Sequence, residues 1–321
     1  MTVEGAHVDE LHVPGDVNPW FTETAWYSFW DPAGRYIGHV YMRFRPNTGA
    51  ADCNVYIWTS GVSLPWDTAY WKCFSMAYPE SIRDLEFVGG LAHRIESDFA
   101  KYRITYDDTR SPLGGAHLDL MLDCVEPPRF FGKKHFDQAM HATGRLRIGD
   151  DEVEIDSLCM RDRSWYTRSD FGNFHSGYSY YLAEDTKILV LSAYSAGTDP
   201  LVSALPIVGG YVNRDGKESA IVGGRRIVES RHAASGAPET LGLEVLLAGG
   251  EVVHLSGRSR NTIGIACNTA MFSWMCLVDW DTDDGPVLGE DQEIWSPSLW
   301  RAFRNGIVQP DRAGTASGVS G

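Results

Sequence analysis

Apolar and polar residues alternate along most of the chain, in short segments that end at turn residues. Two such segments come early, at residues 25–30 (AWYSFW) and 35–45 (RYIGHVYMRFR), and the turn sequence DPAG separates them. Alternation with a period of two is typical of β-strands with one covered face, and Asp, Pro, Asn and Gly favour turns. A second turn, PNTG, leads into residues 50–58, so we predict an antiparallel meander here.

The same pattern continues through the rest of the chain. Further predicted strands and hairpins lie at residues 117–124, 144–156, 176–195, 209–224, 241–257 and 270–280. Helix signals are weak, and the best candidates are residues 79–87 and 296–303. Hairpin after hairpin indicates an all-β protein of antiparallel barrels or sandwiches. The predicted strands, about twenty, exceed one ordinary barrel, so we expect two β domains packed together.

The expected break between the two domains lies at residues 127–134, PPRFFGKK. This places an N-terminal β domain at residues 1–132 and a C-terminal β domain at residues 133–305. Residues 306–321 are rich in Gly, Ser and Ala, and we expect them to form a disordered tail.

Composition excludes several classes of partner. The net charge of −15 argues against nucleic acid and anionic membranes, because both require basic surfaces. No apolar run approaches the roughly 20 residues of a membrane span, and no signal peptide is evident. The six cysteines form no CxxC pair, so we expect small core residues in a reduced, cytoplasmic protein. The eleven Trp, fourteen Tyr and thirteen Phe can build a large apolar cavity.

Familiar catalytic motifs are absent from the sequence. It contains no P-loop, GxGxxG, HExxH or GxSxG motif. His135 and His141 do not have the spacing of metal ligands. We therefore expect neither a metal nor an organic cofactor.

One segment, CMRDRSWYTR at residues 159–168, carries charges along a predicted strand. If the alternation of the preceding hairpin continues, Arg161, Arg163 and Trp165 face the interior, and Asp162 and Ser164 face the other way. Buried guanidinium groups need partners, because their desolvation is costly. The segment is therefore either an Arg–Asp network that joins the two domains or a reactive site.

Residues 135–168 resemble the signature of the carotenoid 1,2-hydratase/AttH-like superfamily, in which a glycine-led hairpin precedes an R-D-H/R-S-W-G-x-R element. The matching positions are Arg161, Asp162, Ser164, Trp165 and Arg168, and Arg163 takes the variant that has Arg in place of His. Tyr166 departs from the pattern, since it replaces the usual Gly. Residues 174–182 and 287–295 are also similar to the family.

The resemblance implies two lipocalin-like antiparallel β-barrel or sandwich domains around a largely apolar pocket. Members include carotenoid hydratases and the fungal kievitone hydratase, and related proteins act as isomerases or cyclases. None of these needs a metal or a nicotinamide. The implied function is a cofactor-independent lyase, a hydratase or dehydratase acting on a C=C bond of a hydrophobic isoprenoid or aromatic small molecule. The alternatives are an isomerase or cyclase, or a lipocalin-like carrier without catalysis; a homodimer is left open.

Hydration of an alkene needs a general acid, and a carboxylic acid in a dry pocket can serve. Asp162 is the candidate acid, and the rings of Trp165 and Tyr166 could stabilise a carbocation. However, Arg161 and Arg163 flank Asp162, and paired arginines would lower the pKa of this carboxyl. In that case the proton must come from elsewhere, and the arginines could instead bind a carboxylate, carbonyl or phenolate of the substrate.

Two sets of candidates result. The catalytic candidates are Asp162, Trp165, His175 and Glu290, with Asp279 and Tyr194 as further proton donors. The substrate-binding candidates are Arg161, Arg163, Tyr166, Arg168 and Tyr194.

Overall fold

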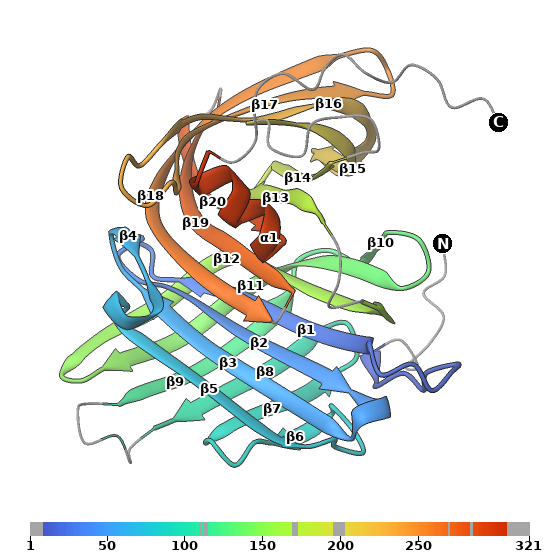
Figure 1. The fold of residues 1–321 in the computed structure, drawn as a ribbon, viewed down its shortest axis with the longest axis vertical. Coiled ribbons are helices and arrows are strands. Elements are labelled where there is room, and N and C mark those ends of the chain that lie inside the picture. Colours follow the sequence, from blue (N-terminus) through green and yellow to red (C-terminus); the bar gives the residue numbers. More distant parts are fainter. Residues whose placement is uncertain are drawn as a thin grey trace.

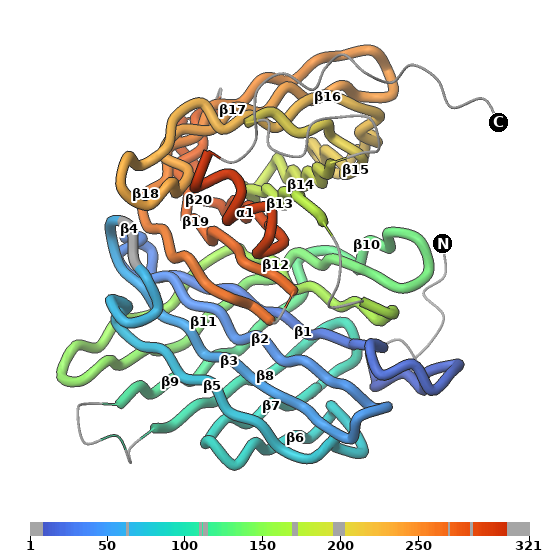
Figure 2. The backbone as a smooth tube through the Cα atoms, in the orientation of Figure 1, coloured from blue at the N-terminus to red at the C-terminus, as the bar shows by residue number. Residues whose placement is uncertain are grey.

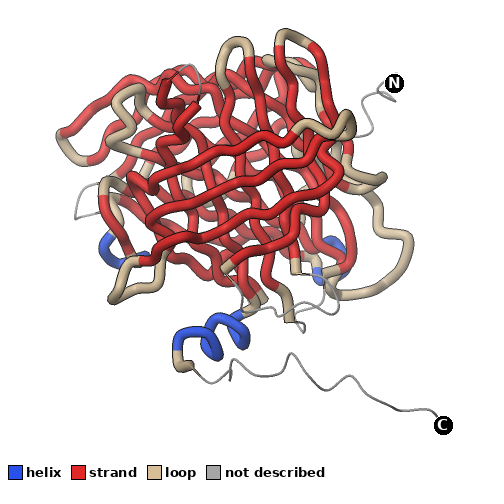
Figure 3. The backbone as a smooth tube through the Cα atoms, turned by 90° about the horizontal axis from the view of Figure 1, so that it is seen from above, coloured by secondary structure: helices blue, strands red, loops and turns tan. Residues whose placement is uncertain are grey.

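Two β-sheets make up nearly all of the structure (Figure 1), and each begins from the hairpins that the alternating pattern predicts. The computed structural model describes residues 9–108, 111, 115–168, 173–194, 203–268, 270–282 and 285–306. Strands form the body of the molecule when it is viewed from above, and the short helix lies at its edge (Figure 3). None of the described helices is long and apolar enough to cross a membrane.

The first sheet is an open half-barrel with the strand order β5-β3-β2-β1-β12-β11-β9-β8-β7-β6, and β10 pairs with β11. Its strands are β1 (Phe21–Trp30), β2 (Ile37–Arg45), β3 (Ala50–Trp58), β5 (Tyr70–Ala77), β6 (Asp84–Glu86), β7 (Leu91–Ser97), β8 (Lys101–Asp107), β9 (Ala116–Cys124), β10 (Arg129–Phe130), β11 (His135–Ile148) and β12 (Asp151–Thr167). Two 3-10 turns lie at Pro46–Thr48 and Pro65–Asp67.

The second sheet closes into an eight-stranded barrel, because β17 pairs with both β16 and β18. Its strands are β13 (His175–Leu182), β14 (Thr186–Ala193), β15 (Ala204–Arg214), β16 (Lys217–Arg231), β17 (Pro238–Leu247), β18 (Val252–Asn268), β19 (Met271–Thr282) and β20 (Gly285–Trp295). The short β4 (Gly61–Ser63) comes from the first half of the sequence, but it pairs in parallel with β18 of the second sheet (Figure 2). Helix α1 (Pro297–Arg304) follows β20.

The predicted fold class is confirmed, since the structure is all-β with two lipocalin-like units. The predicted helix at residues 296–303 is confirmed by α1, whereas the one at residues 79–87 is wrong, because residues 84–86 form β6. This segment buries Ile82, Leu85 and Phe87. These side chains pack into the core of the sheet and do not form one face of a helix. All six cysteines are unpaired; four are buried, but Cys73 and Cys124 are exposed.

The change from the first sheet to the second comes later in the chain than we expected. We placed residues 133–167 in the C-terminal domain, but β11 and β12 belong to the first sheet, where β12 also pairs with β1. The second sheet starts at His175. The Pro-rich segment at 127–134 contributes only the two-residue β10, so it is a link within the half-barrel. Residues 307–321 of the expected tail lie outside the described residues.

The largest hydrophobic cluster is shared by the two sheets, and a second cluster fills the closed barrel. Strand β1 is buried along its whole length, because one face covers the interior of the half-barrel and the other faces the closed barrel. The largest apolar cluster accordingly joins Phe29 and Val40 of the first sheet to Tyr180, Ile263 and Leu277 of the second. This junction positions the candidate site.

Candidate functional site

A cavity of about 520 Å³ lies where the half-barrel meets the closed barrel. Side chains from β1, β2, β3, β11 and β12 form one wall, and side chains from β13, β18, β19 and β20 form the other. Aromatic and aliphatic side chains supply much of this lining, among them Trp26, Tyr56, Ile265 and Met275. A mostly apolar cavity at a domain junction is a common place for a small-molecule site.

The alternation of β12 decides which of its residues reach the cavity. Asp162, Ser164 and Tyr166 line the cavity, whereas Arg161 and Arg163 lie buried on the opposite face. The predicted facing of these residues is therefore confirmed.

Strand β1 supplies the neighbouring lining in register, because Trp26 lies opposite Asp162 and Thr24 lies opposite Ser164. The even-numbered residues of β1 and β12 thus form a continuous part of the first wall of the cavity.

Asp162 binds a histidine and not an arginine. The Nε2 atom of His135 lies 2.7 Å from Oδ2 of Asp162 and 3.3 Å from Oδ2 of Asp137. The hydroxyl of Tyr178 donates to the other oxygen of Asp137 at 2.8 Å. His135, Asp162 and Tyr178 line the cavity, and Asp137 is fully buried behind them. We call these four residues the acid–base cluster.

The acid–base cluster holds its proton strongly. Burial opposes the charged form of His135, but Asp137 and Asp162 outweigh it and raise the pKa of His135 to about 11. Burial also raises the pKa of Asp137, although His135 acts in the opposite direction. Burial raises the pKa of Tyr178 well above its ordinary value, so its hydroxyl stays protonated and acts as a donor.

Oδ2 of Asp137 is buried and has no hydrogen-bond partner in the described part of the chain. Nε2 of His135 has no such partner either, so it contacts both carboxylates as an ion pair, and the shorter contact is to Asp162. The remaining carboxylate therefore attracts a further proton or a cation. His135, Asp137 and Asp162 each offer one ligand atom, all within 4.8 Å of one another, so they could also hold a metal ion.

A second polar group of the cavity, centred on Arg168, lies near the end of β12. The guanidinium of Arg168 is 4.4 Å from the ring centroid of Tyr166 and donates to the hydroxyls of Ser164 and Thr24, the latter at 3.4 Å. Within the described residues no carboxylate forms an ion pair with Arg168. Its hydrogen-bond partners are therefore hydroxyl groups, and Asp162 is a carboxylate whose charge acts on it without an ion pair.

Glu290 does not line the cavity, but it binds a residue that does. Its Oε1 lies 2.8 Å from Nε2 of His39, and both side chains are buried. His39 lines the cavity and packs edge-on against Trp26, with ring centroids 4.9 Å apart. The structure therefore places Glu290 as a partner of His39.

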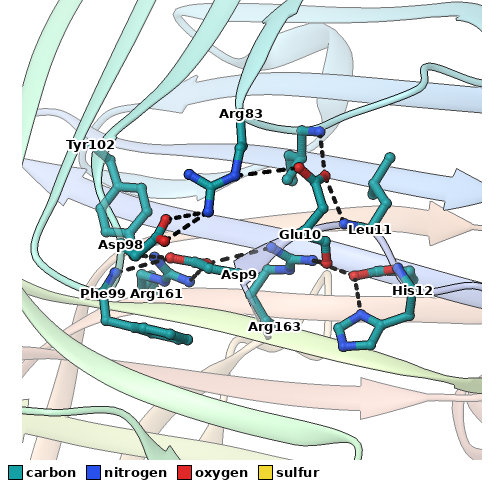
Figure 4. Close-up of polar contacts among 12 residues, drawn as sticks. Asp9, Glu10, Leu11, His12, Arg83, Asp98, Phe99, Tyr102, Arg161 and Arg163 are labelled. Atoms are coloured by element: carbon teal, nitrogen blue, oxygen red, sulfur yellow. Dashed lines mark hydrogen bonds and ion pairs between the residues drawn. The ribbon is translucent and has the colours of Figure 1, made fainter. Parts of the chain in front are cut away.

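Arg161 and Arg163 bind the N-terminal segment inside the half-barrel (Figure 4). Nη2 of Arg161 lies 2.6 Å from Oδ1 of Asp9, and Arg163 pairs with Asp9 and Glu23. All four side chains are buried. A buried ion-pair network therefore exists, but it lies within the half-barrel and does not join the two sheets, and its partners are Asp9 and Glu23 and not Asp162.

The remaining candidates also lie outside the lining. Trp165 stacks on His12 with ring centroids 4.0 Å apart and packs against Phe136 at 6.2 Å. His175 stacks on Trp295 and lies 3.1 Å from Glu293. Asp279 pairs with Arg260 at the surface, and the backbone N–H of Tyr194 donates to the carbonyl oxygen of His175.

Sequence reasoning missed His135, Asp137 and Tyr178 as functional candidates. A signal for Asp137 was available, because the tight turn between β11 and β12 fixes the register and places Asp137 opposite Asp162. Two acidic residues facing each other across a predicted hairpin would have marked the position.

The family described as domain of unknown function DUF7064 matches residues 5–290 of the chain. The chain belongs to this family. No curated protein matches.

Solved structures share the fold at low sequence identity. A candidate AttH from Nitrosomonas europaea has a TM-score of 0.59 and 11% identity, over 88% of this chain and 96% of its own. Kievitone hydratase from Nectria haematococca gives 0.53 and 12%, over 89% and 94%. CghA gives 0.51 and 12%, over 89% and 93%. The likeness to the AttH and hydratase fold that the sequence suggested is thus confirmed for the architecture.

Proposed function

We propose that the protein is an acid–base enzyme that adds water to, or removes water from, a C=C bond of a hydrophobic isoprenoid or aromatic small molecule. The observation that carries the proposal is the acid–base cluster on the wall of an aromatic cavity at the sheet junction. The neighbour with hydratase in its name has the same two-sheet architecture, which supports this choice among acid–base reactions.

Each member of the acid–base cluster has a role in the proposed reaction. His135 is an imidazolium at neutral pH and delivers its proton to one alkene carbon as Asp162 takes up a proton, because neutralising this carboxylate removes one of the charges that raise the pKa of His135. Asp162, 2.7 Å from His135, orients a water molecule and takes its proton as the oxygen bonds to the other carbon. That proton returns to His135, so the cycle closes without a cofactor. Asp137 and Tyr178 hold His135 in position from behind.

A non-catalytic carrier would not need ionisable groups beside its ligand. Here Asp162 and His135 both face the cavity, and such an arrangement is costly in an apolar site unless it has a use. An isomerase or cyclase could use the same groups, and it would leave the mass of the substrate unchanged.

The test is turnover of candidate alkenes and alcohols, followed by mass spectrometry for the gain or loss of one water. We expect Asp162→Asn and His135→Gln each to lower kcat by about 100-fold or more, because general acid–base groups contribute about that much. Asp279→Asn, on an exposed ion pair, is the matched control. Full activity in a folded Asp162→Asn variant would refute the assignment, and turnover without a mass change would favour the isomerase.

A further inference from the structure

Arg168 lines the cavity and forms no ion pair with a carboxylate among the described residues, whereas Asp162 is the carboxylate in the described lining and lies beside His135. The guanidinium of Arg168 would repel a carbocation formed next to it. It would stabilise a developing oxyanion, since fixed positive charge in a site of low polarity acts strongly.

Arg168 is prepared to bind such an oxygen. Its guanidinium is stacked on Tyr166 and held by the hydroxyls of Ser164 and Thr24, so its orientation is fixed without its charge being neutralised. A planar guanidinium held in this orientation on the cavity wall is suited to a carboxylate or carbonyl oxygen.

The spacing between this guanidinium and Asp162 limits the geometry of the ligand. Arg168 donates to Ser164, two residues from Asp162 on β12, and two residues of a strand span about 7 Å. A hydrogen bond from the guanidinium takes up about 2.9 Å of this. The reacting carbon would therefore lie only a few covalent bonds from the oxygen that Arg168 binds.

We infer that the substrate is an apolar molecule with an oxygen that carries or develops negative charge, conjugated to the reacting C=C bond, and that Arg168 binds this oxygen. The inference rests on the proposed function and narrows its substrate class to conjugated ketones or acids. The oxygen of water bonds to the β-carbon, and the π electrons move to the oxygen held by Arg168. Asp162 takes the proton of the water, and His135 returns one to the α-carbon.

A pair of fluorescent probes tests the charge preference of the cavity without a known substrate. The probe 8-anilinonaphthalene-1-sulfonate is anionic, and N-phenyl-1-naphthylamine has the same aromatic body without the sulfonate. Titrations of the wild-type protein should give a lower Kd for the anionic probe. Arg168→Gln should raise that Kd about tenfold, as expected for the loss of a hydrogen bond to a charged group, and should leave the Kd of the neutral probe within about twofold.

Arg225→Gln is the matched control, because Arg225 lies in an exposed pair with Glu244 on the barrel surface. It should change neither Kd. No binding of the anionic probe, equal wild-type affinities for the two probes, or an unchanged Kd in a folded Arg168→Gln variant would each overturn the inference. The comparison in the wild-type protein decides the question even if the variant fails to fold. None of these results depends on turnover, so the Asp162→Asn assay judges the proposed function separately.

Discussion

Replacing Asp9 by Asn tests whether Arg161 and Arg163 stabilise the fold. Asp9 lies 2.6 Å from Arg161 and 3.6 Å from Arg163, and the three side chains are at most 1% exposed. It also accepts hydrogen bonds from the hydroxyl of Tyr102 and, at 3.1 Å, from the backbone N–H of Phe99. Burial alone would raise the pKa of Asp9, but Arg161 and Arg163 outweigh it and hold that pKa well below its usual range.

The expected loss follows from leaving a buried charge without its partner. Removing one member of a buried pair costs about 3–5 kcal/mol in the free energy of unfolding. Asn keeps the size of the side chain and one acceptor, and Arg161 keeps its contact with the ring of Tyr102 at 4.1 Å. We therefore expect Asp9→Asn to cost about 3 kcal/mol, at the lower end. Asp279→Asn breaks an exposed pair with Arg260 and should cost less than about 1 kcal/mol.

Urea unfolding at equilibrium, followed by tryptophan fluorescence, measures both losses. A double variant that combines Asp9→Asn with Arg161→Met removes both charges, so it should recover part of the loss. The reasoning is refuted if Asp9→Asn costs no more than Asp279→Asn, or if the double variant is less stable than the sum of its single changes predicts.

Two further predictions concern the hairpin of β11 and β12. The pKa of His135 is raised to about 11 from 6.5, so the stability from its charged form is fully present below pH 6.5 and is lost as the pH rises toward 11. The advantage of wild type over His135→Gln in urea unfolding should therefore shrink from roughly pH 6 to pH 10, and a constant difference would contradict the assigned pKa. Gly144→Ala should cost about 3 kcal/mol or more, because φ is 147° and the new Cβ would lie 2.0 Å from the carbonyl oxygen of Asp119. In the same unfolding assay Gly149→Ala, at φ 59° with open space around it, should cost about 1–2 kcal/mol, and equal losses would exclude the close approach as the cause.

Alternation was enough to predict the fold class and the facing of β12. A strand's side chains alternate whatever its neighbours are, so the separation of Asp162 from Arg161 and Arg163 could be read from the segment alone. The sheet to which β12 belongs could not be read in this way. Its pairing with β1 joins segments that are far apart in the sequence, and no local pattern encodes it.

The partners of the charged residues were harder to predict than their orientation. Asp9 is separated from Arg161 by 152 residues, and it comes from a segment with no strand pattern. The partner of Asp162 was closer, since His135 lies on the adjacent strand, but it is not the residue directly opposite. The side chain of His135 reaches across the hairpin to Asp162, and sequence register does not specify such rotamers.

The two faces of β12 differ in how completely their charges are neutralised, and this difference separates architecture from chemistry. On the odd-numbered face, the buried arginines each have a carboxylate partner. On the even-numbered face, two carboxylates share His135, and no described carboxylate pairs with Arg168. Stability alone would favour apolar residues at these positions. Charged groups that are only partly neutralised around a cavity are better explained by a bound ligand whose polar groups pair with them.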